Sequence, residues 1–146
     1  MTDESDRDQQ KGFDLSADDP LGQLRKLAEG HSFIDELSPQ FRSFEDGTLY
    51  MLFPHQEQWV NPGMEGSLHG GIVCAMLDTV MGFALMGTAA TTEVNSGPTV
   101  NLNVNFLVGA DEDFEAVGDV VRMGSSTAVV DGILRGVESG ETIATA

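Results

Sequence analysis

Residues 68–87 read LHGGIVCAMLDTVMGFALMG. This segment is apolar on nearly every side of the helix that its composition predicts, and a helix of this kind is buried all round, in a membrane or in the middle of a protein. The carboxyl group of Asp78 and the four glycines within Gly70–Ala90 argue against a membrane span. In a single small domain, we therefore expect a sheet wrapped around this helix.

The strands for such a sheet lie on both sides of the long helix. Residues 99–107 alternate polar and apolar side chains through nine positions, which indicates a half-buried strand. Before the helix, Asp46-Gly47 is expected to turn a hairpin between two strands. Further strands are expected in residues 114–120, 127–137 and 142–146.

The N-terminal part of the chain predicts short helices. Asp19 and Pro20 are suited to the cap and first turn of a helix that ends near Gly30, and a second helix is expected at 33–37. The order of elements predicts an α+β fold, in which an antiparallel sheet wraps around one long central helix and carries an N-terminal helical extension. We expect one domain over residues 17–146, preceded by an acidic, disordered tail over residues 1–16.

The charge of the chain restricts its partners. Its 146 residues carry a net charge of −17, with 24 acidic and 7 basic residues. Nucleic acid and anionic membranes need clustered Lys and Arg, so we expect neither as a partner. The acidic residues are spread over the whole chain, with a net charge of −5 in residues 1–20 and −12 in the remaining 126. Dispersed acid of this kind is typical of halophilic proteins.

Other common site types find no match in the sequence. Cys74 is the one cysteine, and the three histidines lack metal-ligand spacing, so we expect no disulfide framework, metal or separate cofactor. Residues 1–20 lack the basic and apolar regions of a signal peptide, which predicts a cytoplasmic protein. The nucleophile elbow of serine hydrolases and the phosphate loop of nucleotide-binding enzymes are also absent from the sequence.

Two features of the long helix suggest chemistry. Gly70 and Gly71 begin it, where free backbone N–H groups and the positive end of the helix dipole can stabilise an oxyanion. Spacing alone leaves open the plainer interpretation that these glycines only make a tight connection. Asp78 is a carboxylate in an apolar helix, which suits a general base or nucleophile, although a purely structural role remains the alternative.

The spacing of these two features predicts a dimer. Gly70 and Asp78 are eight residues apart, which is about 12 Å along one helix. One ester or thioester carbonyl cannot contact both groups on the same chain. If both act in one site, two subunits must contribute to it.

The residues around the helix resemble those of a known family. Asn61-Pro62, a Gly-containing loop, Leu68-His69-Gly70-Gly71 and then Asp78 resemble the hotdog-fold acyl-CoA thioesterases of the phenylacetyl-CoA thioesterase type. The strand pattern of 99–107 and the segment AVGDVVRMG at 116–124 extend the resemblance over about residues 41–146. The family implies the hotdog fold, a homodimer with shared active sites, and often a tetramer.

The resemblance also implies roles for single residues. Gly70 would supply the N–H that polarises the carbonyl, Asp78 of the other subunit would attack it or activate water, and Thr99 would position water or the acid. Asn61 resembles a loop residue near the thioester, although its loop is longer than in the family. Substrate binding is further expected of His69, Gly71, Arg122, Gly124 and Ser125; Ser125 stands where the family often has a base for the CoA phosphates.

The predicted activity is hydrolysis of an acyl-CoA thioester to the free acid and CoA, with CoA belonging to the substrate. The alternative is a non-catalytic hotdog module that binds an acyl-CoA or an acyl group. A hotdog dehydratase is disfavoured, because the sequence shows no His and acid pair that matches that chemistry.

Overall fold

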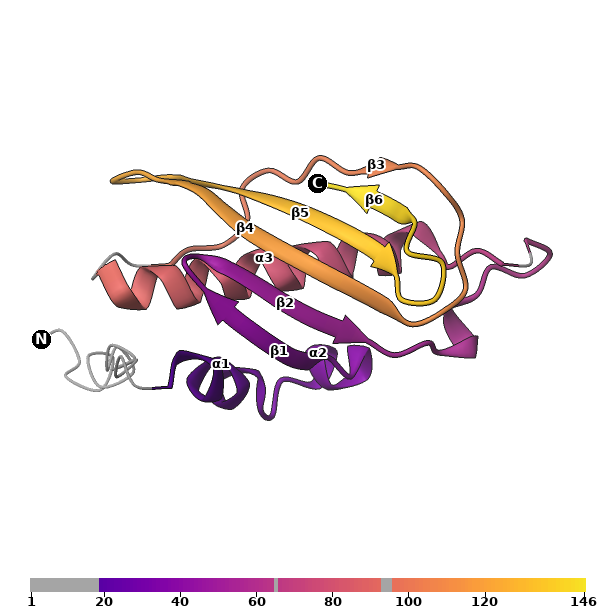
Figure 1. Ribbon diagram of the computed structural model, residues 1–146, viewed down its shortest axis with the longest axis horizontal. Helices are drawn as coiled ribbons and strands as arrows, with labels where there is room; N and C mark the ends of the chain where they lie inside the picture. Colours follow the sequence, from indigo (N-terminus) through magenta and orange to yellow (C-terminus); the bar gives the residue numbers. More distant parts are fainter. Residues whose placement is uncertain (1–18, 65, 93–95) are drawn as a thin grey trace, which may run out of the picture.

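The computed structural model describes residues 19–64, 66–92 and 96–146 (Figure 1). The predicted acidic tail lies outside these residues. The elements, in chain order, are α1 (Pro20–Ala28), α2 (Ser32–Leu37), β1 (Gln40–Glu45), β2 (Thr48–Phe53), the 3-10 helix η2 (Glu57–Trp59), α3 (Gly70–Thr92), β3 (Asn105–Phe106), β4 (Phe114–Met123), β5 (Ala128–Gly136) and β6 (Thr142–Thr145).

The strands form one antiparallel sheet in the order β1-β2-β4-β5-β6-β3. The helix α3 runs along one face of this sheet, and α1 and α2 lie beside β1 (Figure 1). The predicted hairpin is confirmed: Asp46 and Gly47 have positive φ angles and join β1 to β2. The predicted start of α1 is also confirmed, because the side chain of Asp19 accepts a hydrogen bond from the N–H of Gly22.

The core lies between α3 and the inner face of the sheet. Alternate side chains of the central strands point towards the helix and are buried. At Gly118 of β4, the backbone of α3 comes so close that a Cβ would lie 2.8 Å from the carbonyl oxygen of Val80. The core residues on α3 and on the facing strands include Val73, Met76, Leu77, Val80, Leu49, Met51, Phe53, Phe114, Ala116 and Leu134.

The prediction that α3 is buried all round is wrong. One sheet covers one side of the helix. The opposite side keeps Asp78 and six small or apolar residues at least partly exposed: Gly71, Cys74, Ala75, Gly82, Leu85 and Met86. We call this set the open face of α3. By length and composition α3 could also span a membrane, but core helices of soluble proteins meet the same criterion, and more than half of it is buried.

The predicted strand 99–107 is only partly formed. Asn105 and Phe106 pair with Thr145 and Ala144 of β6, and residues 99–104 pair with no strand among the described residues. The backbone of residues 99–104 therefore forms an exposed edge that pairs with no described strand. The side chain of Val100 in this segment is 85% exposed. Exposed edges of this kind are templates for pairing with a second chain.

Candidate functional site

Within the described residues, one backbone donor at the beginning of α3 is unpaired. The N–H of Gly71 donates to Nδ1 of His69 at 3.0 Å, and the N–H of His69 donates to the carbonyl of Trp59 at 2.8 Å. For the N–H of Gly70, no acceptor is found in the described part of the chain. Of the two glycines, Gly70 is therefore the one with a free N–H at the positive end of the helix.

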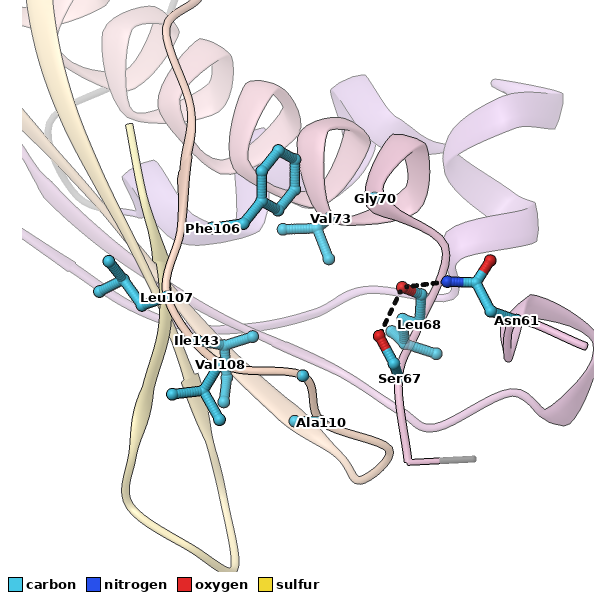
Figure 2. A pocket seen from close by; sticks show the side chains of 11 residues that line it. Asn61, Ser67, Leu68, Gly70, Val73, Phe106, Leu107, Val108, Ala110 and Ile143 are labelled. Carbon is cyan, nitrogen blue, oxygen red and sulfur yellow. Dashed lines mark hydrogen bonds between the residues drawn. The ribbon is translucent and has the colours of Figure 1, made fainter. Parts of the chain in front are cut away.

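Gly70 lies on the wall of a pocket of about 280 Å³. Figure 2 shows the side chains that line it, from the loop before α3, the first turn of α3, the end of β3 and β6. The amide of Asn61 donates to the carbonyl of Leu68 at 3.2 Å, which fixes this side chain at the pocket. The lining residues are Asn61, Ser67, Leu68, Gly70, Val73, Phe106, Leu107, Val108, Gly109, Ala110 and Ile143.

Asp78 lies two turns further along α3, on the open face. The hydroxyl group of Thr99 donates a hydrogen bond of 2.7 Å to its Oδ1. The structure thus brings Asp78 and Thr99 together, as expected for a positioning contact. It does not bring Asp78 to Gly70, because both belong to the same unbroken helix and lie about 12 Å apart along its axis.

The third group of candidates lies at the other end of the molecule. Gly124 and Ser125 follow β4 in the hairpin to β5, far from the start of α3 (Figure 1). Arg122 lines a second cavity of about 320 Å³, together with Thr88 of α3 and the hairpin residues Asp46 and Gly47. One chain therefore presents three separate groups along the length of α3.

The remaining polar contacts fix loops. His55 lies 2.7 Å from Asp111, and the carboxylate of Glu112 accepts hydrogen bonds from the N–H groups of Glu138 and Ser139 and from the Ser139 hydroxyl. These bonds, that of the Ser139 side chain first, hold the pKa of Glu112 below its ordinary value of 4.5. Within the described residues, no group of three or more His, Cys, Asp or Glu side chains is suited to a metal ion.

Sequence reasoning missed the walls of the pocket. Phe106 was expected only as part of a half-buried strand, yet its ring reaches the first turn of α3, where a Cβ on Gly70 would lie 3.3 Å from Cε1 of the ring. Ser67 and the loop 107–110 were also missed. The apolar alternation that ends at Phe106 was the one available signal, and it could not indicate which part of the helix the ring would contact.

A model of the thioesterase superfamily matches residues 65–143, a range that holds α3, the strands β3, β4 and β5, and every pocket residue except Asn61. The chain belongs to the thioesterase superfamily. A protein of Halobacterium salinarum that is named as an esterase is 31% identical over 121 residues, which are 82% of this chain and 79% of that protein.

Several solved structures share the fold. The PaaI protein of the phenylacetic acid degradation operon of E. coli has a TM-score of 0.72 at 19% identity, over 86% of this chain and 88% of its own. Thioesterase superfamily member 2 of Mus musculus has a TM-score of 0.72 at 22% identity, over 86% and 91%. The hotdog fold expected from the sequence is thereby confirmed, and the superfamily supports a hydrolase that acts on thioesters.

Proposed function

We propose that this protein hydrolyses an acyl-CoA thioester in a site shared by two copies of the chain. The free N–H of Gly70 at the wall of an uncharged pocket is the observation that carries the proposal. A backbone donor at a helix N-terminus stabilises the negative charge that develops on the carbonyl oxygen during attack. Asp78 of the partner subunit is the acid that completes the site.

Two surfaces of the chain are suited to contact with a second copy of the same chain. The open face of α3 holds Asp78 among small and apolar side chains, so another helix could approach it closely. If two α3 helices pack antiparallel about a two-fold axis, Gly70 of each lies beside Asp78 of the other, and residue 74 lies near the axis. The unpaired edge 99–104 gives the same pair of chains a continuous sheet.

Arg122 supports an anionic leaving group. The chain has a net charge of −17 and only 7 basic residues. The Arg122 guanidinium lines a cavity, where its positive charge is suited to binding a phosphate group. The cavity holds Thr88, ten residues or about 15 Å along α3 from Asp78. In the shared site, the phosphates of CoA would reach Arg122 and the hairpin at Gly124 and Ser125 while the thioester lies between Gly70 and Asp78.

The reaction has two possible forms in this geometry. As a general base, Asp78 takes a proton from water, the hydroxyl oxygen bonds to the carbonyl carbon, and the carbon–sulfur bond breaks to release the CoA thiolate, which is then protonated. As a nucleophile, the carboxylate displaces the thiolate itself and forms an anhydride, which water then cleaves. In both, Thr99 orients the carboxylate and Gly70 binds the oxyanion.

The test is release of free thiol from a panel of acyl-CoAs in molar KCl, with wild type and Asp78→Asn. Loss of an essential base lowers kcat by about 10²–10⁴-fold. Asp119→Asn is a matched control, since Asp119 also accepts a hydrogen bond from a threonine, Thr48, but lies on the outer face of the sheet. Full activity of Asp78→Asn overturns the assignment of Asp78. No turnover of any acyl-CoA by the folded protein favours a binding module instead.

A further inference from the structure

We infer that the pocket beside Gly70 binds the acyl end of the substrate, that it selects an uncharged acyl group of limited length, and that Phe106 sets this selection. The inference rests on the proposed function and deepens it. It follows from the chemistry of the pocket wall, from its size and from the position of one ring.

The pocket wall is uncharged, and apolar and polar atoms share its surface. Leu68, Val73 and Ile143 are buried in it, and Leu107 and Val108 add further apolar surface. None of its eleven lining residues carries a charge. A carboxylate at the far end of an acyl group would lose its hydration there without gaining a cation, which is costly.

The polar groups of the wall are largely used within the fold. The N–H of Leu68 donates to Ala110, and those of Leu107 and Val108 donate to Ile143. The Asn61 amide and the Ser67 hydroxyl both donate to the carbonyl of Leu68. These donors are therefore not available to the amide-containing arm of CoA, whereas an alkyl or aryl group needs none.

The volume of the pocket limits the length of the group. At about 280 Å³ the pocket lies just below the range of roughly 300–1,000 Å³ that is usual for ligand pockets. A group of moderate size fits this volume better than a two-carbon acyl group or a long fatty acyl chain.

Phe106 lies where the acyl chain would continue from the thioester carbonyl. Its Cε1 and Cζ would lie 3.3 and 3.4 Å from a Cβ on Gly70, so the ring is packed against the backbone whose N–H binds the oxyanion. Figure 2 shows the ring turned towards the first turns of α3, beside Val73. The ring is 57% exposed, so its substitution changes the pocket more than the core.

The experiment uses S-alkyl-CoA thioethers, which bind without being hydrolysed, with chains from ethyl to dodecyl and matched chains that end in a carboxylate. Dissociation constants are measured by calorimetry in molar KCl for wild type, Phe106→Ala and Phe33→Ala. Phe33 is a matched control, because it is 53% exposed and lies on α2 outside the pocket.

For wild type, binding should tighten about fourfold for each added methylene, up to about octyl, and then level off or weaken. Carboxylate-ended chains should bind about a hundredfold more weakly than their uncharged counterparts. Phe106→Ala should move the optimum to longer or bulkier chains and weaken the best wild-type ligand about tenfold, while Phe33→Ala leaves the profile unchanged.

An unchanged length profile in folded Phe106→Ala overturns the role of Phe106. Equal binding of carboxylate-ended chains, or continued tightening to dodecyl, overturns the assignment of the pocket. Because thioethers are not cleaved, these results are separate from the proposed hydrolysis. A length limit without any turnover of acyl-CoA would reject the proposed hydrolysis and support the assignment of the pocket. Turnover without a length limit would support the hydrolysis and reject the assignment of the pocket.

Discussion

The hydroxyl group of Thr99 donates a 2.7 Å hydrogen bond to Oδ1 of Asp78, across 21 residues of sequence. This bond attaches the segment before β3 to the open face of α3 and leaves the carboxylate with a fixed orientation. It has a close counterpart on the outer face of the sheet, where Thr48 donates to Asp119 at 2.6 Å. The two pairs allow a controlled comparison between the proposed catalytic carboxylate of Asp78 and the surface carboxylate of Asp119.

Thr99→Val should lower kcat about tenfold, because a hydrogen bond to a charged acceptor contributes about 1.5 kcal/mol or more to its positioning. KM should change little, since Thr99 is proposed to act through Asp78 rather than on the acyl group. Thr99→Ser keeps the donor and should restore most of kcat. Thr48→Val is the control, and an equal loss of kcat in both valine variants would show that the effect is general destabilisation.

The role of the Gly70 N–H can be separated from the space that a glycine leaves. Gly70→Ala keeps the N–H but adds a Cβ against Phe106, whereas Gly70→Pro also removes the N–H. Proline is tolerated at the first position of a helix, which Gly70 occupies. We expect kcat of the proline variant to fall about 10²–10³-fold below that of the alanine variant. Equal kcat values in two folded variants would remove Gly70 from the mechanism.

Mixed dimers test whether the site is shared. Subunits with Gly70→Pro and subunits with Asp78→Asn are each expected to be inactive alone. When they are unfolded together and refolded, half of the dimers carry one copy of each, and in these one of the two sites has both groups intact. Activity should return to about a quarter of the wild-type value. No recovery, with mixed dimers demonstrated by differently tagged subunits, would place both groups in sites of single chains.

Glu112 should make stability depend on pH. Its pKa is lowered in the folded protein, first by the Ser139 hydroxyl, so its contribution is present above the unfolded pKa and is lost as the pH falls through the folded pKa. Glu112→Gln should therefore lower Tm by a few degrees at pH 7, and the difference should shrink at a pH well below 4.5. Glu141→Gln, in the loop between β5 and β6 that Glu112 contacts, is the control. A constant difference across this range would contradict the linkage.

The dispersed acidic charge should make stability depend on salt. Asp119 and Asp131 face each other across β4 and β5, and like charges in such pairs are destabilising. Asp131→Asn should raise Tm by about 1–2 °C in 0.1 M KCl, which corresponds to about 0.5 kcal/mol. In 2 M KCl, screening should remove the gain. A gain that persists at high salt would point to packing rather than repulsion.

The local elements and the family of the fold could be predicted from short-range features of the amino-acid sequence. Asp19, the turn at Asp46-Gly47 and the apolar segment from Gly70 onwards act through short-range rules of capping, turn geometry and hydrophobic pattern, so each could be read without knowing its neighbours. The same is true of the distance between Gly70 and Asp78, because the rise of a helix is fixed.

Tertiary structure alone decided which groups face each other. The pairing of β3 with β6 stops at Asn105, so residues 99–104 form an exposed edge instead of the expected half-buried strand. Which glycine keeps a free N–H depends on where the His69 ring turns, and the pocket wall joins Phe106 to Gly70 across 36 residues of sequence. Such contacts arise from the packing of distant segments, which hydrophobic pattern indicates only as buried or exposed and not as neighbours.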